Sequence, residues 1–230
     1  MVETINSIRL RGFVCDEPVY DHTIYGEAFY RIGLAVGRLS GVLDRLPVTV
    51  SERLLGDSKA NLYEQGSVAE ISGQIRSYNQ TSGEKSRLLV TVFAREIELE
   101  EHELPFDDDQ KNHEICNAST ADISDTEYKN EAELCGSICK PVVYRTTPFG
   151  REIADILIAV NRRYGKSDYL PCIAWGRNAR FADMLEVGDC IHIRGRMQSR
   201  EYQKNLPDGT AEQRMTYEIS CSAIEKRERW

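Results

Sequence analysis

Small and apolar residues occupy every second position in several separated stretches of this chain. Residues 8–14, 32–36 and 190–194 each show this alternation. A period of two is the spacing that a half-buried β-strand requires, because successive side chains point to opposite faces. The pattern therefore predicts a chain built largely from short β-strands.

The stretch 169–200 combines two such strands with one short helix. Ala179, Ala182 and Leu185 recur at three-residue spacing, so they can share one helical face, and Gly188 allows a turn after them. A strand–helix–strand order also begins a parallel α/β unit, but the flanking segments have strand periods and no further helix period. The sequence therefore favours a small all-β barrel.

Trp175 lies in the strand that precedes this helix. We interpret Ile173, between Cys172 and Ala174, as buried, and we expect the indole of Trp175 to lie on the opposite face, close to Arg177. An outward indole beside a guanidinium group would offer a platform on which a flat ligand can stack.

The same pattern occurs twice, at a spacing near 124 residues. The matching positions are Asn6 and Asn130, Leu10 and Leu134, Gly12 and Gly136, 25–26 and 149–150, 34–36 and 158–160, Arg38 and Arg162, and 46–47 and 170–171. After a two-residue deletion, Gly66 and Gly73 match Gly188 and Gly195. This repeat predicts two copies of one barrel. We call residues 1–100 the first copy and residues 130–230 the second copy, joined by an acidic flexible linker at 101–129.

The second copy resembles the bacterial single-stranded DNA-binding proteins. The motifs that carry the resemblance occur in the family's order: Asn130–Gly136, Thr147–Gly150, Ala159–Arg162, Trp175–Arg177, Val187–Asp189 and Gly195–Arg200. The resemblance covers about 100 residues, and several ordered motifs are more specific than any single one. It implies an all-β fold of two tandem OB-fold five-stranded barrels, each with one short capping helix.

The resemblance also implies the residues that contact a nucleic acid strand. Binding without sequence preference needs aromatic faces for base stacking and cations along the phosphate track. The implied stacking residues are Trp175, Tyr169, Tyr164 and Tyr202. The implied phosphate contacts are Arg162, Arg163, Lys166, Arg177, Arg196, Arg200 and Lys204.

Each of these residues also has a purely structural interpretation. A tryptophan on a strand is often part of a core, Tyr169 could plug the barrel, and exposed tyrosines and arginines are often simply solvated. The matching positions of the first copy hold no aromatic residue, since they are Ser40, Arg45, Ser51 and Gln80, although Tyr78 lies near the last. We therefore predict that the first copy binds a strand weakly or not at all.

Charge is distributed unevenly along the chain. The net charge is −8, but residues 101–130 alone hold 2 basic and 9 acidic groups, whereas residues 131–230 hold 16 basic and 14 acidic groups. The second copy is therefore mildly basic, and binding must depend on local clusters.

In the linker, Glu103–Asp109 resembles in composition, but in reversed order, the acidic tip by which the family recruits partners. A solvated linker is the alternative, and the family's acidic tail is absent from residues 225–230.

The sequence gives little support for catalysis or for a bound metal. It contains no glycine-rich phosphate loop, and its four histidines are dispersed. Cys135 and Cys139 have a spacing suited to a metal, but no second pair follows, and the seven cysteines suggest small apolar residues in a reducing compartment. We expect no enzyme activity, no cofactor and no metal. With neither a membrane span nor a signal peptide in the sequence, we expect a cytoplasmic protein of bacterial, phage or mobile-element origin.

The expected function is binding of single-stranded DNA in replication, recombination or repair. Two alternatives stay open, namely an OB-fold module that docks onto replication or mobile-element proteins, and a protein whose natural ligand is single-stranded RNA. Because one-barrel members of the family assemble into tetramers, the resemblance also suggests a homodimer with four barrels.

Overall fold

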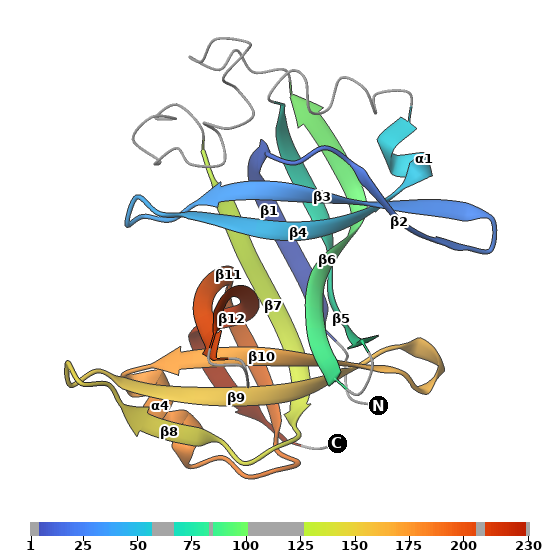
Figure 1. Ribbon diagram of the computed structural model, residues 1–230. Coiled ribbons are helices and arrows are strands. Elements are labelled where there is room, and N and C mark those ends of the chain that lie inside the picture. The colour runs from blue at the N-terminus through green and yellow to red at the C-terminus, as the bar shows by residue number, and fades with distance from the viewer. Residues whose placement is uncertain (1–4, 57–66, 83–84, 101–126, 206–209, 229–230) are drawn as a thin grey trace. The chain divides into compact units, whose positions relative to one another are not determined.

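The computed structural model describes residues 5–56, 67–82, 85–100, 127–205 and 210–228. The chain divides into two compact units (Figure 1). One consists of residues 1–6, 75–90 and 132–230, and the other of residues 7–74 and 91–131. Gly66, Trp230, the segment Glu103–Asp109 and almost all of the predicted linker lie outside the described residues. The predicted boundaries at 100 and 130 stay a prediction.

The first copy forms a closed five-stranded ring with one extra strand. Its elements are β1 (Asn6–Val14), β2 (Val19–Ile24), β3 (Glu27–Gly37), β4 (Leu43–Ser51), α1 (Glu52–Leu55), β5 (Val68–Ser82) and β6 (Lys85–Glu100). The ring runs β1–β3–β4–β6–β5 and closes where β5 pairs with β1. The β4–β6 pair is parallel and β2 pairs with β3 at the edge. This order and one parallel closure are those of an OB-fold barrel.

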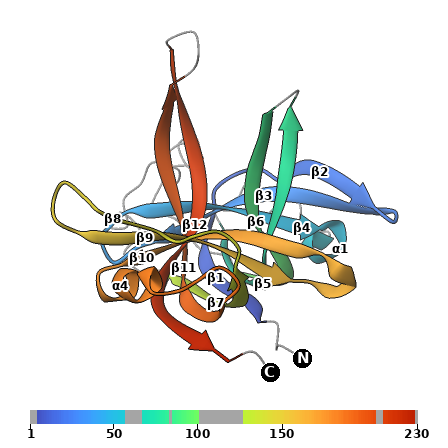
Figure 2. The ribbon, with the colours of Figure 1, turned by 90° about the horizontal axis from the view of Figure 1, so that it is seen from below.

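The second copy repeats this arrangement strand for strand. Its elements are β7 (Lys129–Ile138), β8 (Val143–Thr146), β9 (Glu152–Asn161), η2 (Arg163–Gly165), β10 (Ser167–Trp175), α4 (Arg177–Asp183), β11 (Cys190–Asn205) and β12 (Ala211–Arg227). The ring runs β7–β9–β10–β12–β11, with β10 and β12 parallel and β8 added at the edge. Figure 2 shows β11 and β12 as a long twisted ribbon. The predicted fold of two OB-fold barrels is confirmed.

The cores of the two copies are built from matching residues. Leu10, Leu34 and Leu46 are fully buried in the first copy, and the residues 124 positions later, Leu134, Ile158 and Leu170, are fully buried in the second. In each copy a short helix follows the third ring strand. The predicted apolar face of the second helix is buried, with Ala179 and Ala182 at 0% exposure and Leu185 just after the helix end.

Matching glycines mark places where two strands come too close for a side chain. A Cβ atom added to Gly12 would lie 2.2 Å from the carbonyl oxygen of Ala35, and one on Gly136 would lie 2.7 Å from that of Ala159. These distances are too short for non-bonded atoms, so only glycine fits. The repeated pair shows that both barrels close in the same way at the β1–β3 and β7–β9 crossings.

Candidate nucleic-acid interface

The outer face of β10 carries two exposed aromatic side chains. The residues at even positions, such as Cys172 and Ala174, are buried in the barrel, whereas Tyr169 is 47% exposed and Trp175 is 41% exposed. Trp175 therefore points outward, as expected. However, the register of β10 against β9 is unbroken, so Ile173 and Trp175 are two residues apart on the same face. The expectation that they face opposite ways is wrong, because a period of two places both on the outer side.

This outer face continues across β12 onto β11. Ile173 lies opposite Ser220 of β12, and Ser220 lies opposite Arg196 of β11. Partners directly opposite each other in a sheet share a face. The same alternation along β11 then brings four predicted residues onto this face, which are Arg196, Arg200, Tyr202 and Lys204. The structure thus gathers two predicted aromatic positions of β10 and one of β11 on one surface.

A further candidate on this face was not predicted from the sequence. Arg145 of β8 lies opposite Ile153 of β9, which lies opposite Trp175, so the three form one row across the sheet. The Arg145 guanidinium group is exposed and donates to Asp155 at 2.6 Å and 3.0 Å. Only the pairing of β8 with β9 reveals this residue, because the periodicity of one segment does not show which residues lie opposite it.

The turn between β9 and β10 presents the remaining predicted aromatic residue. Tyr164 is 97% exposed and has a φ of 64°, a left-handed conformation that is uncommon for a residue with a side chain. Its neighbours Arg163 and Lys166 are also exposed. The turn therefore leaves the Tyr164 ring in solvent beside two cations.

The predicted cations differ in how far they are already engaged. Arg177, at the start of α4, is exposed and makes no ion pair with another described residue. Arg196 donates to the side-chain oxygen of Gln198 at 2.9 Å. The Arg200 guanidinium lies 3.5 Å from the Glu218 carboxylate, which also accepts a hydrogen bond from Gln198. Arg177 is therefore better placed than these two to meet a phosphate.

Arg162 is held by a buried carboxylate. One of its terminal nitrogens lies 2.7 Å from Oδ1 of Asp168, whose side chain is fully buried. The same Oδ1 accepts a 2.7 Å hydrogen bond from the backbone N–H of Ser77, which belongs to the same compact unit. Arg38 and Asp44 form the same buried ion pair 124 residues earlier. A pair that recurs in both copies favours a structural role for Arg162.

Burial dominates the electrostatics of this pair in the second copy. It raises the pKa of Asp168 above its ordinary value, although the Ser77 N–H and the guanidinium groups of Arg162 and Arg76 act in the opposite direction. The second carboxylate oxygen of Asp168 and Nε of Arg162 are buried without a hydrogen-bond partner among the described residues. The pair therefore depends on one short contact, and its loss would leave a poorly solvated carboxylate.

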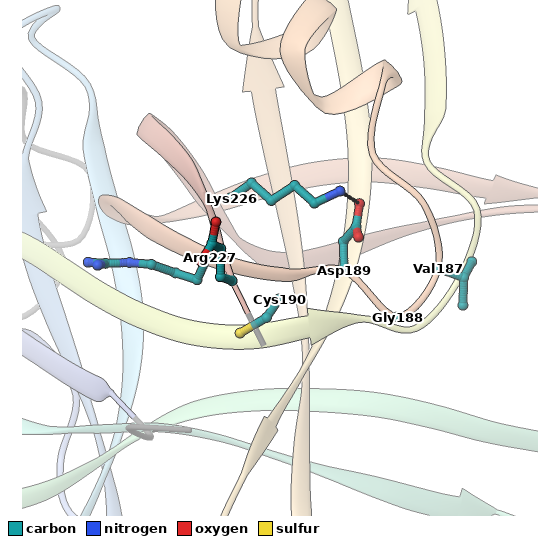
Figure 3. A pocket seen from close by; sticks show the side chains of 7 residues that line it. Val187, Gly188, Asp189, Cys190, Lys226 and Arg227 are labelled. Carbon is teal, nitrogen blue, oxygen red and sulfur yellow. Dashed lines mark hydrogen bonds and ion pairs between the residues drawn. The ribbon is translucent and has the colours of Figure 1, made fainter. Parts of the chain in front are cut away.

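A hollow at the Val187–Asp189 turn lies away from the predicted site residues. Figure 3 shows its lining, in which the Lys226 ammonium group reaches Asp189 at 2.8 Å. Cys190 also lines it, and its sulfur lies 3.8 Å from that of Cys135. The ion pair engages two of the charged residues that line the hollow, and none of the residues predicted to contact a nucleic acid strand lines it.

Cys135 and Cys139 do not act as a pair. Cys135 is buried against Cys190, whereas the Cys139 thiol donates to the carbonyl oxygen of Leu157 at 3.2 Å, and burial raises the pKa of Cys139. Within the described ranges, no group of three or more His, Cys, Asp or Glu side chains could hold a metal ion. No described helix is long and apolar enough to cross a membrane.

The fold and the outer face define the class of the second copy, an OB-fold barrel with exposed aromatic rings and cations on one sheet face. Residues 129–226 match the model of the single-strand binding protein family. The resemblance predicted from the sequence is thus confirmed for this part of the chain. The match includes no residue of the first copy, so nothing in it assigns a role to residues 1–100.

Known proteins similar to the chain agree with this assignment. Single-stranded DNA-binding protein 1 of Staphylococcus aureus is 33% identical over 81 residues, and single-stranded DNA-binding protein A of Bacillus subtilis is 32% identical over 81 residues. These alignments cover 32% of this chain and only 48% and 47% of the relatives. The crystal structure of the single-stranded DNA-binding protein from Thermus aquaticus covers 99% of this chain with a TM-score of 0.71 at 20% identity, a likeness of fold.

Proposed function

We propose that this protein binds single-stranded DNA without strong sequence preference, through the outer face of the second copy. The observation that carries the proposal is the continuous surface on which Tyr169, Trp175 and Tyr202 share one sheet face with Arg196, Arg200 and Lys204. Bases stack on the rings while the cations neutralise phosphates. The strand is thereby kept from pairing again. The match of residues 129–226 to the family supports this function.

The first copy is proposed to contribute less to stacking. Arg45, which matches Tyr169, points its guanidinium group to Asp16 at 2.6 Å. Ser51, which matches Trp175, is buried and its hydroxyl accepts a hydrogen bond from the backbone N–H of Leu54 at the start of α1. Ser51 therefore offers no flat face to a base, and the guanidinium group of Arg45 is already engaged by a carboxylate.

Substitution in both copies tests the assignment. Trp175→Ala should weaken binding of a labelled oligo(dT) by about 5- to 150-fold, the equivalent of one lost stacking contact of about 1–3 kcal/mol. Arg45→Ala and Ser51→Ala at the matching positions should leave that affinity nearly unchanged. Fluorescence anisotropy at fixed salt measures all three variants. Equal losses in the two copies would show that the second copy is not the principal binding surface.

A protein-docking module is the main alternative, favoured by the overall charge of −8. It predicts no binding of oligo(dT) at any salt concentration.

Single-stranded RNA is a separate alternative ligand, because stacking does not distinguish the sugars. Competition between DNA and RNA oligonucleotides of matched sequence separates the two. We propose DNA, acting in replication, recombination or repair in the cytoplasm.

We also propose that two chains associate as a homodimer, which would bring four barrels together. Sedimentation velocity at working concentration should give twice the chain mass of 26.2 kDa. A strict monomer would remove this proposal and leave the binding function intact. Recruitment of replication or recombination proteins stays a proposal, and its candidate segment lies outside the described residues.

A further inference from the structure

A small hollow in the first copy lies where its strands meet the capping helix. It is lined by residues of β3 (Glu27, Phe29), the end of β4 (Ser51), α1 (Arg53, Leu54) and β6 (Phe93, Ala94, Arg95). All of these belong to one compact unit. The hollow has a volume of about 190 Å³, which is below the range of about 300–1,000 Å³ that is typical of small-molecule sites. It therefore suits a single flat ring.

Its position corresponds to that of Trp175 in the second copy. Ser51 is 124 residues before Trp175 and ends the matching strand. In the second copy this position carries an exposed indole ring. In the first copy it carries a small side chain turned into the helix cap, so the space beside it is open. The two copies thus differ in shape at one place, with a platform in one and a hollow in the other.

Aromatic rings form the apolar wall of the hollow. The rings of Phe29 and Phe93 lie with their centroids 5.5 Å apart and tilted by 38°. The His22 ring is stacked on Phe29 at 5.0 Å and 13°. Phe29 thus contacts two other rings, Phe93 is half-buried, and both phenylalanines line the hollow. Rings held in this way are rigid and lose little freedom when a base packs against them.

The charged groups at the hollow suit a nucleotide. The Arg53 side chain is 84% exposed and its Nε lies 4.0 Å from Glu27, beyond hydrogen-bond distance, and Arg95 is exposed as well. Both can reach phosphates beside the opening. The Oε1 atom of Glu27 is buried and has no hydrogen-bond partner among the described residues. An acceptor in this state is stabilised when a ligand brings an N–H donor.

We infer that this hollow binds one unpaired nucleobase that carries an exocyclic amino group, with Glu27 as the acceptor and Arg53 and Arg95 at the adjacent phosphates. A carboxylate accepting from the amino group of cytosine is a known mode of base readout, and thymine has no such group. The first copy would thus add a base preference that the stacking face of the second copy lacks. The inference rests on the proposed single-strand binding.

The test compares oligo(dC) with oligo(dT) on the full-length chain carrying Trp175→Ala, which weakens the second copy's own stacking. Oligo(dC) should bind at least about fivefold more tightly than oligo(dT), because only cytosine satisfies the buried carboxylate oxygen. Adding Glu27→Ala should remove this preference. Glu17→Ala, which removes an exposed carboxylate of the same unit outside the hollow, should preserve it. Arg53→Ala should weaken both oligonucleotides.

The outcomes separate this inference from the proposed function. If the unmutated chain binds oligo(dT) but Glu27→Ala leaves the dC-to-dT ratio unchanged, the inference is wrong and single-strand binding stands. If the unmutated chain binds neither oligonucleotide, both are wrong. Circular dichroism of each variant checks that the barrel is intact. Glu27 is at the beginning of its strand and partly exposed, so its replacement should not unfold the chain.

Discussion

Arg162 and Arg177 have the same side chain and were predicted to have the same role, yet their surroundings differ. Arg162 contacts the fully buried Asp168, while Arg177 is exposed and has no ion-pair partner among the described residues. An exposed guanidinium group can bind a phosphate without giving up an existing partner. One that already neutralises a buried carboxylate cannot leave it without a cost in stability.

The two arginines should therefore give opposite results on substitution. Arg162→Ala should lower the free energy of unfolding by roughly 1–3 kcal/mol, less than for a fully buried pair because its guanidinium is partly exposed. Arg177→Ala should change stability by less than about 0.5 kcal/mol and weaken DNA binding, reducing the slope of log affinity against log salt by about one. Urea unfolding and salt-dependent titration measure the two effects. The reverse pattern would make Arg162 the phosphate contact.

The sequence was sufficient to find most of the candidate residues of the outer face, though not Arg145, and it did not reveal the contacts between distant segments. The sequence predicted an outward Trp175, which is 41% exposed, and left open a core position for Tyr169, which is 47% exposed. Asp168 was missed, because its partners are Arg162, six positions away, and Ser77, 91 positions away. Periodicity reports which face a residue occupies and says nothing about contacts between distant segments. Ile173 and Trp175 share the outer face because residues two positions apart on a strand point the same way.

At the scale of elements, the barrels depend on strands that pass close to one another. Gly12 on β1 meets the backbone of β3, and Gly136 on β7 meets that of β9. Both glycines were found from the sequence as a repeated pair, but the reason for them is a crossing that only the strand order reveals. The family resemblance predicted five-stranded OB-fold barrels, and the order β1–β3–β4–β6–β5 comes from the structure. Alternation alone would have allowed other ways of pairing the strands.

Replacing either glycine should destabilise its barrel. In Gly136→Ala the new methyl group meets the carbonyl oxygen of Ala159, and in Gly12→Ala that of Ala35. Backbone must move in both cases, so the free energy of unfolding should fall by about 1–3 kcal/mol. Thermal and urea unfolding measure the loss. Gly150→Ala is unsuitable as a control because its φ of 73° adds strain, whereas Ser222→Ala, at an exposed position of β12, should cost less. Wild-type stability in Gly136→Ala would show that the crossing is looser than described.

At the scale of the whole molecule, two copies of one barrel have diverged in the surface they offer. The second has rings and cations on an open sheet face, and the first has a hollow with one acidic acceptor. The sequence revealed the repeat and the loss of aromatic residues in the first copy. It could not reveal the hollow, which is formed by residues of β3, β4, α1 and β6 that are far apart in the chain.

Mild basicity of the second copy sets how its affinity responds to salt. Residues 131–230 carry 16 basic and 14 acidic groups, and several of the basic groups are already paired. Few phosphates can therefore be neutralised, and the decrease of affinity with salt should be shallow. Stacking then supplies the larger share of the binding free energy.

The most direct test of the outer face is the fluorescence of Trp175 during titration with oligo(dT). The Trp230→Phe variant leaves Trp175 as the sole tryptophan, since the chain contains two. If bases stack on the indole, its emission should decrease to saturation as DNA is added, at low and at moderate salt. Emission that stays constant while the anisotropy of labelled DNA reports binding would show that the strand lies elsewhere, and no binding in either assay would contradict the proposed function.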